Sequence, residues 1–121
     1  TRMNRLKTGA LINFSVEAGA MIGCASEAER TALSRYAHDV GLAFQMRDDI
    51  LDAEGVVRDT GKAVGKDKDR GKVNFVTVMG AEATRERVTM LAAQAKQHLA
   101  LFGPRARILL SAVDFVVERR Y

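Results

Sequence analysis

Apolar side chains recur at three- and four-residue steps along most of the 121-residue chain. This period predicts four long helices, because residues at that spacing share one helical face. The helices are expected at residues 3–23, 26–53, 82–102 and 105–119. Their inward stripes are expected to comprise Met3, Leu6, Ala10, Phe14, Ala18 and Met21; Leu33, Tyr36, Val40, Ala43 and Met46; Val88, Leu91, Ala92, Ala95 and Leu99; and Ile108, Leu109, Ala112, Phe115 and Val116.

Short signals mark where these helices begin and end. Ser26 followed by Glu29 matches a capping box, in which each side chain bonds the backbone N–H of the other residue. Gly55 is expected to stop the second helix, and Gly103 with Pro104 to separate the third from the fourth. The predicted fold class is therefore all-α, a helical bundle.

Residues 55–72 have no hydrophobic period and combine four glycines with six lysines or arginines. This composition predicts a mobile surface loop that is long enough to suggest a function. The apolar segment 73–79 that follows is expected to form a short helix, which Asn74 is able to cap.

Small residues are frequent in the first predicted helix. Gly9, Gly19 and Gly23 weaken it intrinsically, but they permit close packing, so this helix is expected to be buried. Cys24 is expected to be small core filler rather than a catalytic thiol.

Composition and charge narrow the function classes. Apolar residues make up 47% of the chain, which excludes a disordered protein. The net charge of +4 is too mild to require nucleic acid, but it suits a small polyanion such as a diphosphate. No charge-free run approaches the roughly 20 residues of a membrane-spanning helix, and no signal peptide is expected. The single cysteine indicates a reducing compartment, and we expect a cytoplasmic protein.

Three aspartates lie close together on the second predicted helix. Asp48 and Asp49 lie four and three residues before Asp52, so their Cβ atoms should be about 5–6 Å from that of Asp52. Their charges repel, aspartate is a poor helix former, and the expected helix C-terminus disfavours anions. A bound cation would offset all three effects, and carboxylates without His or Cys favour Mg²⁺ over Zn²⁺. The alternative is a solvated acidic helix end, paired with Arg47 or with the basic loop.

Three glycine–lysine pairs follow, with lysines at Lys62, Lys66 and Lys72. Glycine lets the backbone approach an anion, and lysine brings a mobile charge to it. The spacing is not that of a nucleotide P-loop, and Val73 replaces its Ser or Thr. By itself the segment is a solvated charged loop; beside the aspartates it completes a site for a metal and a phosphate.

Three motifs together resemble those of the trans-isoprenyl diphosphate synthases, or polyprenyl synthetases. The run Lys7-Thr8-Gly9-Ala10-Leu11 is similar to their K-T-G-x-L motif, and residues 44–52 to their second aspartate motif, F-Q-x-x-D-D-x-x-D. The glycine–lysine pairs and the final Glu118-Arg119-Arg120-Tyr121 are similar to the segments that follow in the family. Asn74 departs from the usual threonine. The resemblance extends over nearly the whole chain.

The resemblance implies an isoprenoid synthase fold and a magnesium-dependent reaction. An allylic diphosphate ionises, and isopentenyl diphosphate attacks the resulting carbocation head to tail. By similarity, Mg²⁺ would be bound by Asp48, Asp49 and Asp52, partly through water.

The family's substrate residues are matched as well. By resemblance, Lys7 and Lys62 would contact the allylic diphosphate, and Lys72 would add to the phosphate clamp. Thr8 and Gln45 would line the reacting end of the substrate. Phe44 is interpreted as a buried core aromatic in preference to one that faces the carbocation.

The family's first aspartate motif and the arginines that bind isopentenyl diphosphate have no counterpart in this sequence. Residues 1–121 are therefore expected to be the C-terminal helical part of a single isoprenoid synthase domain, inactive alone. The full-length family forms homodimers, and the product length cannot be inferred.

Two other classes of protein fit these residues less well. A non-catalytic helical subunit or binding partner would have no physical need for the three aspartates, Lys7, Thr8 and Gln45. A nucleic-acid binder is disfavoured because Asp59, Asp67 and Asp69 interrupt the basic loop. Terpene cyclases and head-to-head synthases also have aspartate motifs, but the two motifs found here favour the chain-elongating branch.

Overall fold

The computed structural model describes residues 2–60 and 74–120, and the side chains of residues 6–55 and 74–120. Within these ranges every regular element is a helix, which confirms the all-α fold class. The elements are α1 (Arg2–Ile22), α2 (Glu27–Thr60), α4 (Phe75–Met79), α5 (Ala81–His98), the 3-10 helix η1 (Ala100–Ala106) and α6 (Arg107–Glu118).

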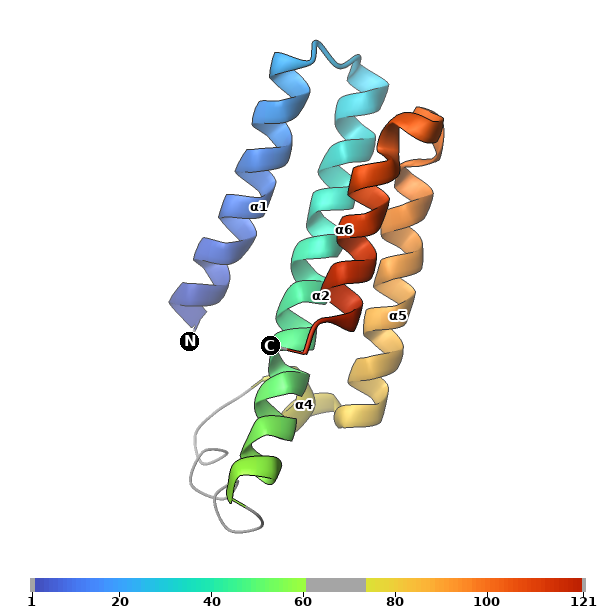
Figure 1. The fold of residues 1–121 in the computed structure, drawn as a ribbon. Helices are drawn as coiled ribbons and strands as arrows, with labels where there is room; N and C mark the ends of the chain where they lie inside the picture. The colour runs from blue at the N-terminus through green and yellow to red at the C-terminus, as the bar shows by residue number, and fades with distance from the viewer. Residues whose placement is uncertain (1, 61–73, 121) are drawn as a thin grey trace.

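Helix α2 is the centre of the bundle (Figure 1). Helix α1 runs antiparallel to it, whereas α5 and α6 form a second antiparallel pair that packs against it. The buried apolar side chains form one core between α2, α5 and α6: Tyr36, Val40, Ala43, Met46, Ile50, Val88, Leu91, Ala95, Leu99, Ala106, Val113 and Val116. The stripes predicted for the second and third helices are thus confirmed, with Leu33 and Ala92 half-buried at the edge.

Two polar contacts join the layers of this core. The Tyr36 hydroxyl donates to the backbone carbonyl of Leu109 on α6, with an O···O distance of 2.8 Å. The buried carboxylate of Asp39 lies 3.1 Å from Nε2 of His98 on α5. Each contact gives a polar group inside the bundle a partner, as burial requires.

The turn between α1 and α2 has a Schellman motif. The backbone N–H of Ala25 donates to Ala20 O, at 2.9 Å, and that of Cys24 to Met21 O, at 3.1 Å. Cys24 has a φ of 55°, the left-handed conformation that this motif requires. Its side chain is exposed, so the prediction that Cys24 fills the core is wrong: the motif places it outside the bundle.

The prediction of a buried first helix is also wrong for this chain. Apolar side chains of α1 remain largely exposed, among them Leu6, Leu11, Phe14, Met21 and Ile22. Helix α1 packs mainly on α2, and one neighbouring helix covers only one side of a cylinder. Among the described helices, none combines the length and the apolar character that crossing a bilayer requires.

Helix α2 continues to Thr60, so the predicted stop at Gly55 and the predicted loop at residues 55–60 are wrong. A glycine inside a helix costs only about 1 kcal/mol, and other contacts exceed that cost. Here Arg85 of α5 donates to Glu54 at 2.7 Å, one residue before the glycine. The remainder of the predicted loop, residues 61–72, lies outside the described residues.

The last helices differ from the prediction in detail. Helix α5 ends at His98, four residues early, and the 3-10 helix η1 follows it. The predicted break at Gly103 and Pro104 is confirmed, because Gly103 has a non-helical backbone, with a φ of 59° and a ψ of −139°. On α6, Val113 and Val116 are buried, whereas Ile108 is 75% and Phe115 is 56% exposed. The predicted inward positions of Ile108 and Phe115 are wrong because α6 has two adjacent apolar stripes, and only one contacts α2 and α5.

Candidate functional site

The three aspartates of α2 occupy three different environments. Asp49 is only 3% exposed, and its Oδ2 accepts a hydrogen bond from the backbone N–H of Phe75 at 3.0 Å. Asp48 is half-exposed, and its Oδ1 lies 3.3 Å from Nη2 of Arg119. Asp52 is exposed. Asp48 and Asp52, one turn apart, therefore present carboxylate oxygens to solvent, whereas Asp49 joins α2 to the start of α4.

Because α2 ends at Thr60, the aspartates lie about two to three turns before its C-terminus. The macrodipole acts mainly within the last turn, so the expected destabilisation by the helix end does not apply. Repulsion among the carboxylates remains. In the described part of the chain, no three acidic, histidine or cysteine side chains converge on one ion position.

The donor chemistry fits a magnesium ion held by two carboxylates. Asp48 and Asp52 are hard oxygen ligands without a neighbouring His or Cys on α2. Magnesium in proteins is commonly bound by one or two carboxylates, several waters and the phosphates of the substrate. The buried and hydrogen-bonded Asp49 does not have the same access to solvent.

Two arginines join the end of α6 to this part of α2. Arg47 donates through Nε and Nη2 to the backbone carbonyl of Arg119, at 3.1 and 2.9 Å. The guanidinium of Arg119 lies over the ring of Phe44, 4.0 Å from its centroid, and beside Asp48. The partner of Asp48 is thus Arg119, not the adjacent Arg47 that was considered from the sequence. Phe44 packs against the core, in agreement with its interpretation as a core aromatic.

Sequence reasoning missed Arg47 and Arg119 as parts of the site. The similarity of the C-terminal Glu118-Arg119-Arg120-Tyr121 to the family was the available signal. It did not indicate that Arg119 contacts an aspartate 71 residues earlier.

Gly9 on α1 and Gly41 on α2 allow the two helices to approach closely, on the N-terminal side of the aspartates of α2. A methyl group added at Gly41 would meet the Cα of Gly9 at 4.0 Å, so the helices cross closely there. The helices are antiparallel and rise about 1.5 Å per residue, so Lys7 lies about 3 Å and Gln45 about 6 Å beyond the crossing in the same direction. Asp48 lies about 10 Å beyond it. Lys7 is exposed, and Thr8 and Gln45 are half-buried.

The short helix α4 packs against α2 and α5, and its first residue contacts Asp49. Asn74 Oδ1 accepts from the backbone N–H of Thr77 at 2.9 Å, which confirms the predicted cap. The buried Thr84 hydroxyl of α5 lies 2.7 Å from Gly80 O and 3.3 Å from Phe75 O, and the second contact connects α5 to α4. The predicted phosphate ligands Lys62 and Lys72 lie outside the described residues.

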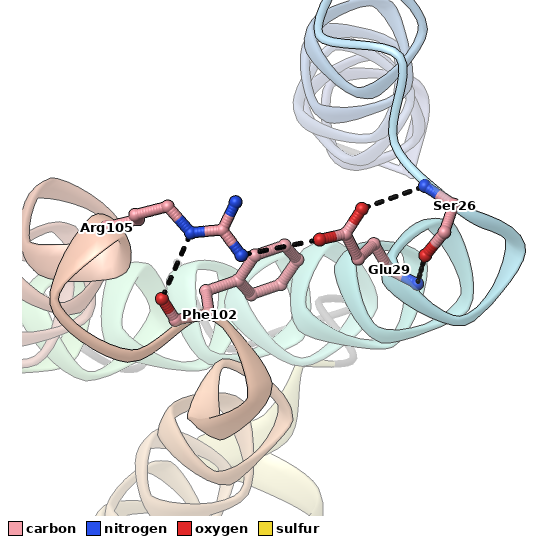
Figure 2. A network of polar contacts seen from close by, with 4 residues as sticks. All are labelled: Ser26, Glu29, Phe102 and Arg105. Atoms are coloured by element: carbon pink, nitrogen blue, oxygen red, sulfur yellow. Dashed lines mark hydrogen bonds and ion pairs between the residues drawn. The ribbon is translucent and has the colours of Figure 1, made fainter.

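A second polar network occupies the opposite end of the bundle (Figure 2). The Ser26 N–H donates to Glu29 Oε1 at 2.8 Å and the Glu29 N–H to Ser26 Oγ at 3.2 Å, so the capping box is confirmed. Arg105 lies 3.4 Å from Glu29 Oε2 and donates to Phe102 O at 3.3 Å. An apolar groove of about 450 Å³ opens beside it, between α1, α2 and η1.

Residues 1–101 match the family model of the polyprenyl synthetases. Together with the helical bundle and the aspartate-bearing α2, this match shows that the chain belongs to the polyprenyl synthetase family.

The chain is similar to family members with different products. It is 35% identical to a geranylgeranyl diphosphate synthase of Cyanophora paradoxa, over 93% of this chain and 38% of that protein. It is 38% identical to a farnesyl diphosphate synthase of Geobacillus stearothermophilus, over 80% of this chain and 33% of that protein. The chain thus spans about one third of the length of these curated relatives.

Solved structures agree with the fold. The crystal structure of an FPP/GFPP synthase from Zymomonas mobilis matches 91% of this chain and 34% of its own, with 38% identity and a TM-score of 0.75. The crystal structure of a proposed farnesyl-diphosphate synthase from Marinomonas matches 93% of this chain and 36% of its own, with 28% identity and a TM-score of 0.74.

Proposed function

We propose that this chain supplies one half of the active site of a prenyltransferase. The enzyme would join an allylic diphosphate to isopentenyl diphosphate, head to tail. The observation that supports this most directly is that Lys7, Thr8 and Gln45 lie beyond the Gly9–Gly41 crossing in the same direction along the bundle as Asp48 and Asp52. The names of the similar synthases support the same class of reaction.

Each of these five residues has a physical role in the proposal. Asp48 and Asp52 would hold Mg²⁺ through their exposed oxygens, and the bound ion would stabilise the charge that develops on the leaving diphosphate. Lys7 is an exposed cation that would bind the same diphosphate. Thr8 and Gln45, polar and half-buried, would line the reacting end.

Asp49 has a different role in this arrangement. Its buried carboxylate accepts from Phe75 N–H and holds α4 against α2. It would therefore support the metal site, even though it belongs to the same sequence motif. Residues 62 and 72 would add two lysines to the phosphate clamp, as the resemblance implies.

The remaining parts of the enzyme belong to the two thirds of the relatives that this chain does not match. The first aspartate motif and the isopentenyl diphosphate site would come from there, so the 121-residue chain would be inactive alone. We further propose that the assembled enzyme is a cytoplasmic homodimer, and that residues 1–121 are the C-terminal helical part of its single isoprenoid synthase domain.

A chimera tests the proposal. The matching third of the Geobacillus enzyme would be replaced by this chain, and transfer of the geranyl group from geranyl diphosphate to labelled isopentenyl diphosphate measured with and without Mg²⁺. We expect Mg²⁺-dependent product from the chimera and none from the chain alone. Asp48→Asn should reduce the rate by about 100-fold, as loss of a group that stabilises transition-state charge does.

Asp114→Asn is the matched control, because Asp114 is an exposed acid on α6 that pairs with Lys96. It should leave the rate unchanged. A folded chimera without activity would contradict the proposal and favour the non-catalytic helical subunit. Equal losses from Asp48→Asn and Asp114→Asn would contradict the role of the aspartate face.

A further inference from the structure

The C-terminal end of the described chain lies beside α2 (Figure 1), where Arg119 contacts Asp48. Arg119 follows the last residue of α6 and has an extended backbone, with a φ of −61° and a ψ of 149°. Its N–H donates to Phe115 O at 2.9 Å, and its carbonyl receives two hydrogen bonds from Arg47. The backbone of Arg119 is therefore fixed from both sides, and Arg47 places a positive charge at the C-terminus of α6, where it is favourable.

The Arg119 side chain is fixed as well. It is only 8% exposed, its guanidinium lies over the ring of Phe44, and its Nη2 is 3.4 Å from Phe44 O. These contacts do not involve Asp48. The buried guanidinium would therefore keep its place without that aspartate.

The orientation of the Asp48 carboxylate depends on Arg119, whereas the position of Arg119 does not depend on Asp48. Its side chain is 49% exposed, and Nη2 of Arg119 is the donor that reaches its Oδ1. An ion pair with so exposed a carboxylate contributes little to stability, about 0–1 kcal/mol. What the contact does supply is orientation, because one oxygen is directed at a rigid donor and the other is left for a ligand.

We propose that Arg119 is a positioning residue that orients the Asp48 carboxylate for the metal. This inference rests on the proposed function above. Hydrogen bonds to a ligating carboxylate orient it, and their removal typically lowers metal affinity by about 10–100-fold. The charge of Arg119 does not oppose the site, because the metal would arrive with a diphosphate and the complex has a net negative charge.

Binding of Mn²⁺ with inorganic diphosphate to the full chain tests the inference, with free Mn²⁺ followed by electron paramagnetic resonance. Arg119→Ala should weaken binding by about 10-fold or more. Arg120→Ala, a neighbouring exposed arginine, is the control and should bind as the unmodified chain does. Thermal unfolding without metal shows which variants remain folded.

A double-mutant cycle separates orientation from general support of the fold. In an Asp48→Asn background, Arg119→Ala should cause no further loss, because the carboxylate that it orients is gone. Equal losses in both backgrounds would mean a merely structural role and would overturn the inference. Unweakened binding by folded Arg119→Ala would overturn it too.

One further variant keeps the test decisive. If Arg119→Ala does not fold, Arg119→Lys keeps the charge and the stem but not the planar donor fork, and it should still weaken binding. Binding by Arg119→Lys equal to that of the unmodified chain would overturn the inference. If the unmodified chain binds no Mn²⁺ and Asp48→Asn changes nothing, the proposed metal site itself is wrong, and the inference with it. Binding that depends on Asp48 but not on Arg119 refutes the inference alone.

Discussion

Both halves of α2 meet an arginine from the C-terminal part of the chain, but the two arginines are used differently. Near the start of α2, the Arg105 side chain is 69% exposed and lies 3.4 Å from Glu29. Near the aspartates, the Arg119 side chain is 8% exposed and lies 3.3 Å from Asp48. The distances are alike, whereas the burial of the cation is not.

At the start of α2 the polar groups satisfy one another. The backbone hydrogen bond from Ser26 lowers the pKa of Glu29 below its usual value, and the pairing with Arg105 contributes in the same direction. The Ser26 N–H engages Oε1 of Glu29 and Arg105 engages Oε2, so both carboxylate oxygens have a partner. Such a network caps the start of a helix and leaves few polar atoms available to bind a ligand.

Around the aspartates, the carboxylate oxygens outnumber the hydrogen-bond donors that the described residues supply. Asp49 is engaged inside the bundle, whereas Asp48 and Asp52 keep oxygens on the surface. The comparison teaches that a charged cluster is a candidate site when its burial is uneven: here a buried arginine contacts one exposed carboxylate, and a buried carboxylate joins α2 to α4.

The largest effect is expected from Asp49→Ala. Removal of the buried carboxylate leaves the Phe75 N–H without that acceptor, and the lost charged hydrogen bond should cost about 1.5–3 kcal/mol. Urea unfolding measures the change. Asp52→Ala is the control, because an exposed substitution should stay within about 0.5 kcal/mol. Equal losses would mean that the two aspartates are not distinguished by burial.

A substitution in the capping box at the start of α2 should lower the free energy of unfolding by less. Ser26→Ala removes the acceptor of the Glu29 N–H and should lower the free energy of unfolding by about 1 kcal/mol, as loss of an N-cap does. Ser34→Ala, an exposed serine inside the same helix, should be neutral or slightly stabilising because alanine is the better helix former. A loss from Ser34→Ala as large as that from Ser26→Ala would refute the capping role.

Tyr36 lies between the two ends of α2, and its burial should make the free energy of unfolding depend on pH in alkaline solution. Burial raises its pKa from 10.0 to about 12. Between these values the unfolded chain loses the proton and the folded chain keeps it, so stability should fall as pH rises from about 10 to about 12. Tyr36→Phe should cost about 1 kcal/mol at neutral pH through its lost hydrogen bond. The variant should show a smaller alkaline loss in urea unfolding, and an unchanged slope would contradict this.

The smallest effect is expected at Glu29, in acid. Its lowered pKa means that its contribution is complete above 4.5 and is lost as pH falls through the folded value. Glu29→Gln keeps an acceptor for the Ser26 N–H but cannot titrate, so its unfolding midpoint should depend less on pH below about 4.5. Glu27→Gln, an exposed residue of the same turn, should leave the acid dependence unchanged.

Much of the local structure could be predicted because its causes are close together in the chain. The Ser26–Glu29 box and the Asn74 cap each join residues three positions apart, and both were confirmed. The stripes of α2 and α5 follow from the helical period. The family could also be inferred, since its motifs are short runs of residues.

The sequence by itself therefore determined the helical class, two helix starts and the family of this protein. Tertiary packing decided the rest: the continuation of α2 past Gly55, the exposure of Cys24 and Phe115, and the separation of Asp49 from Asp48. It also brought Arg119 to Asp48 across 71 positions. The physical reason is that local signals act over one helical turn, whereas burial and long-range pairing depend on which helices become neighbours.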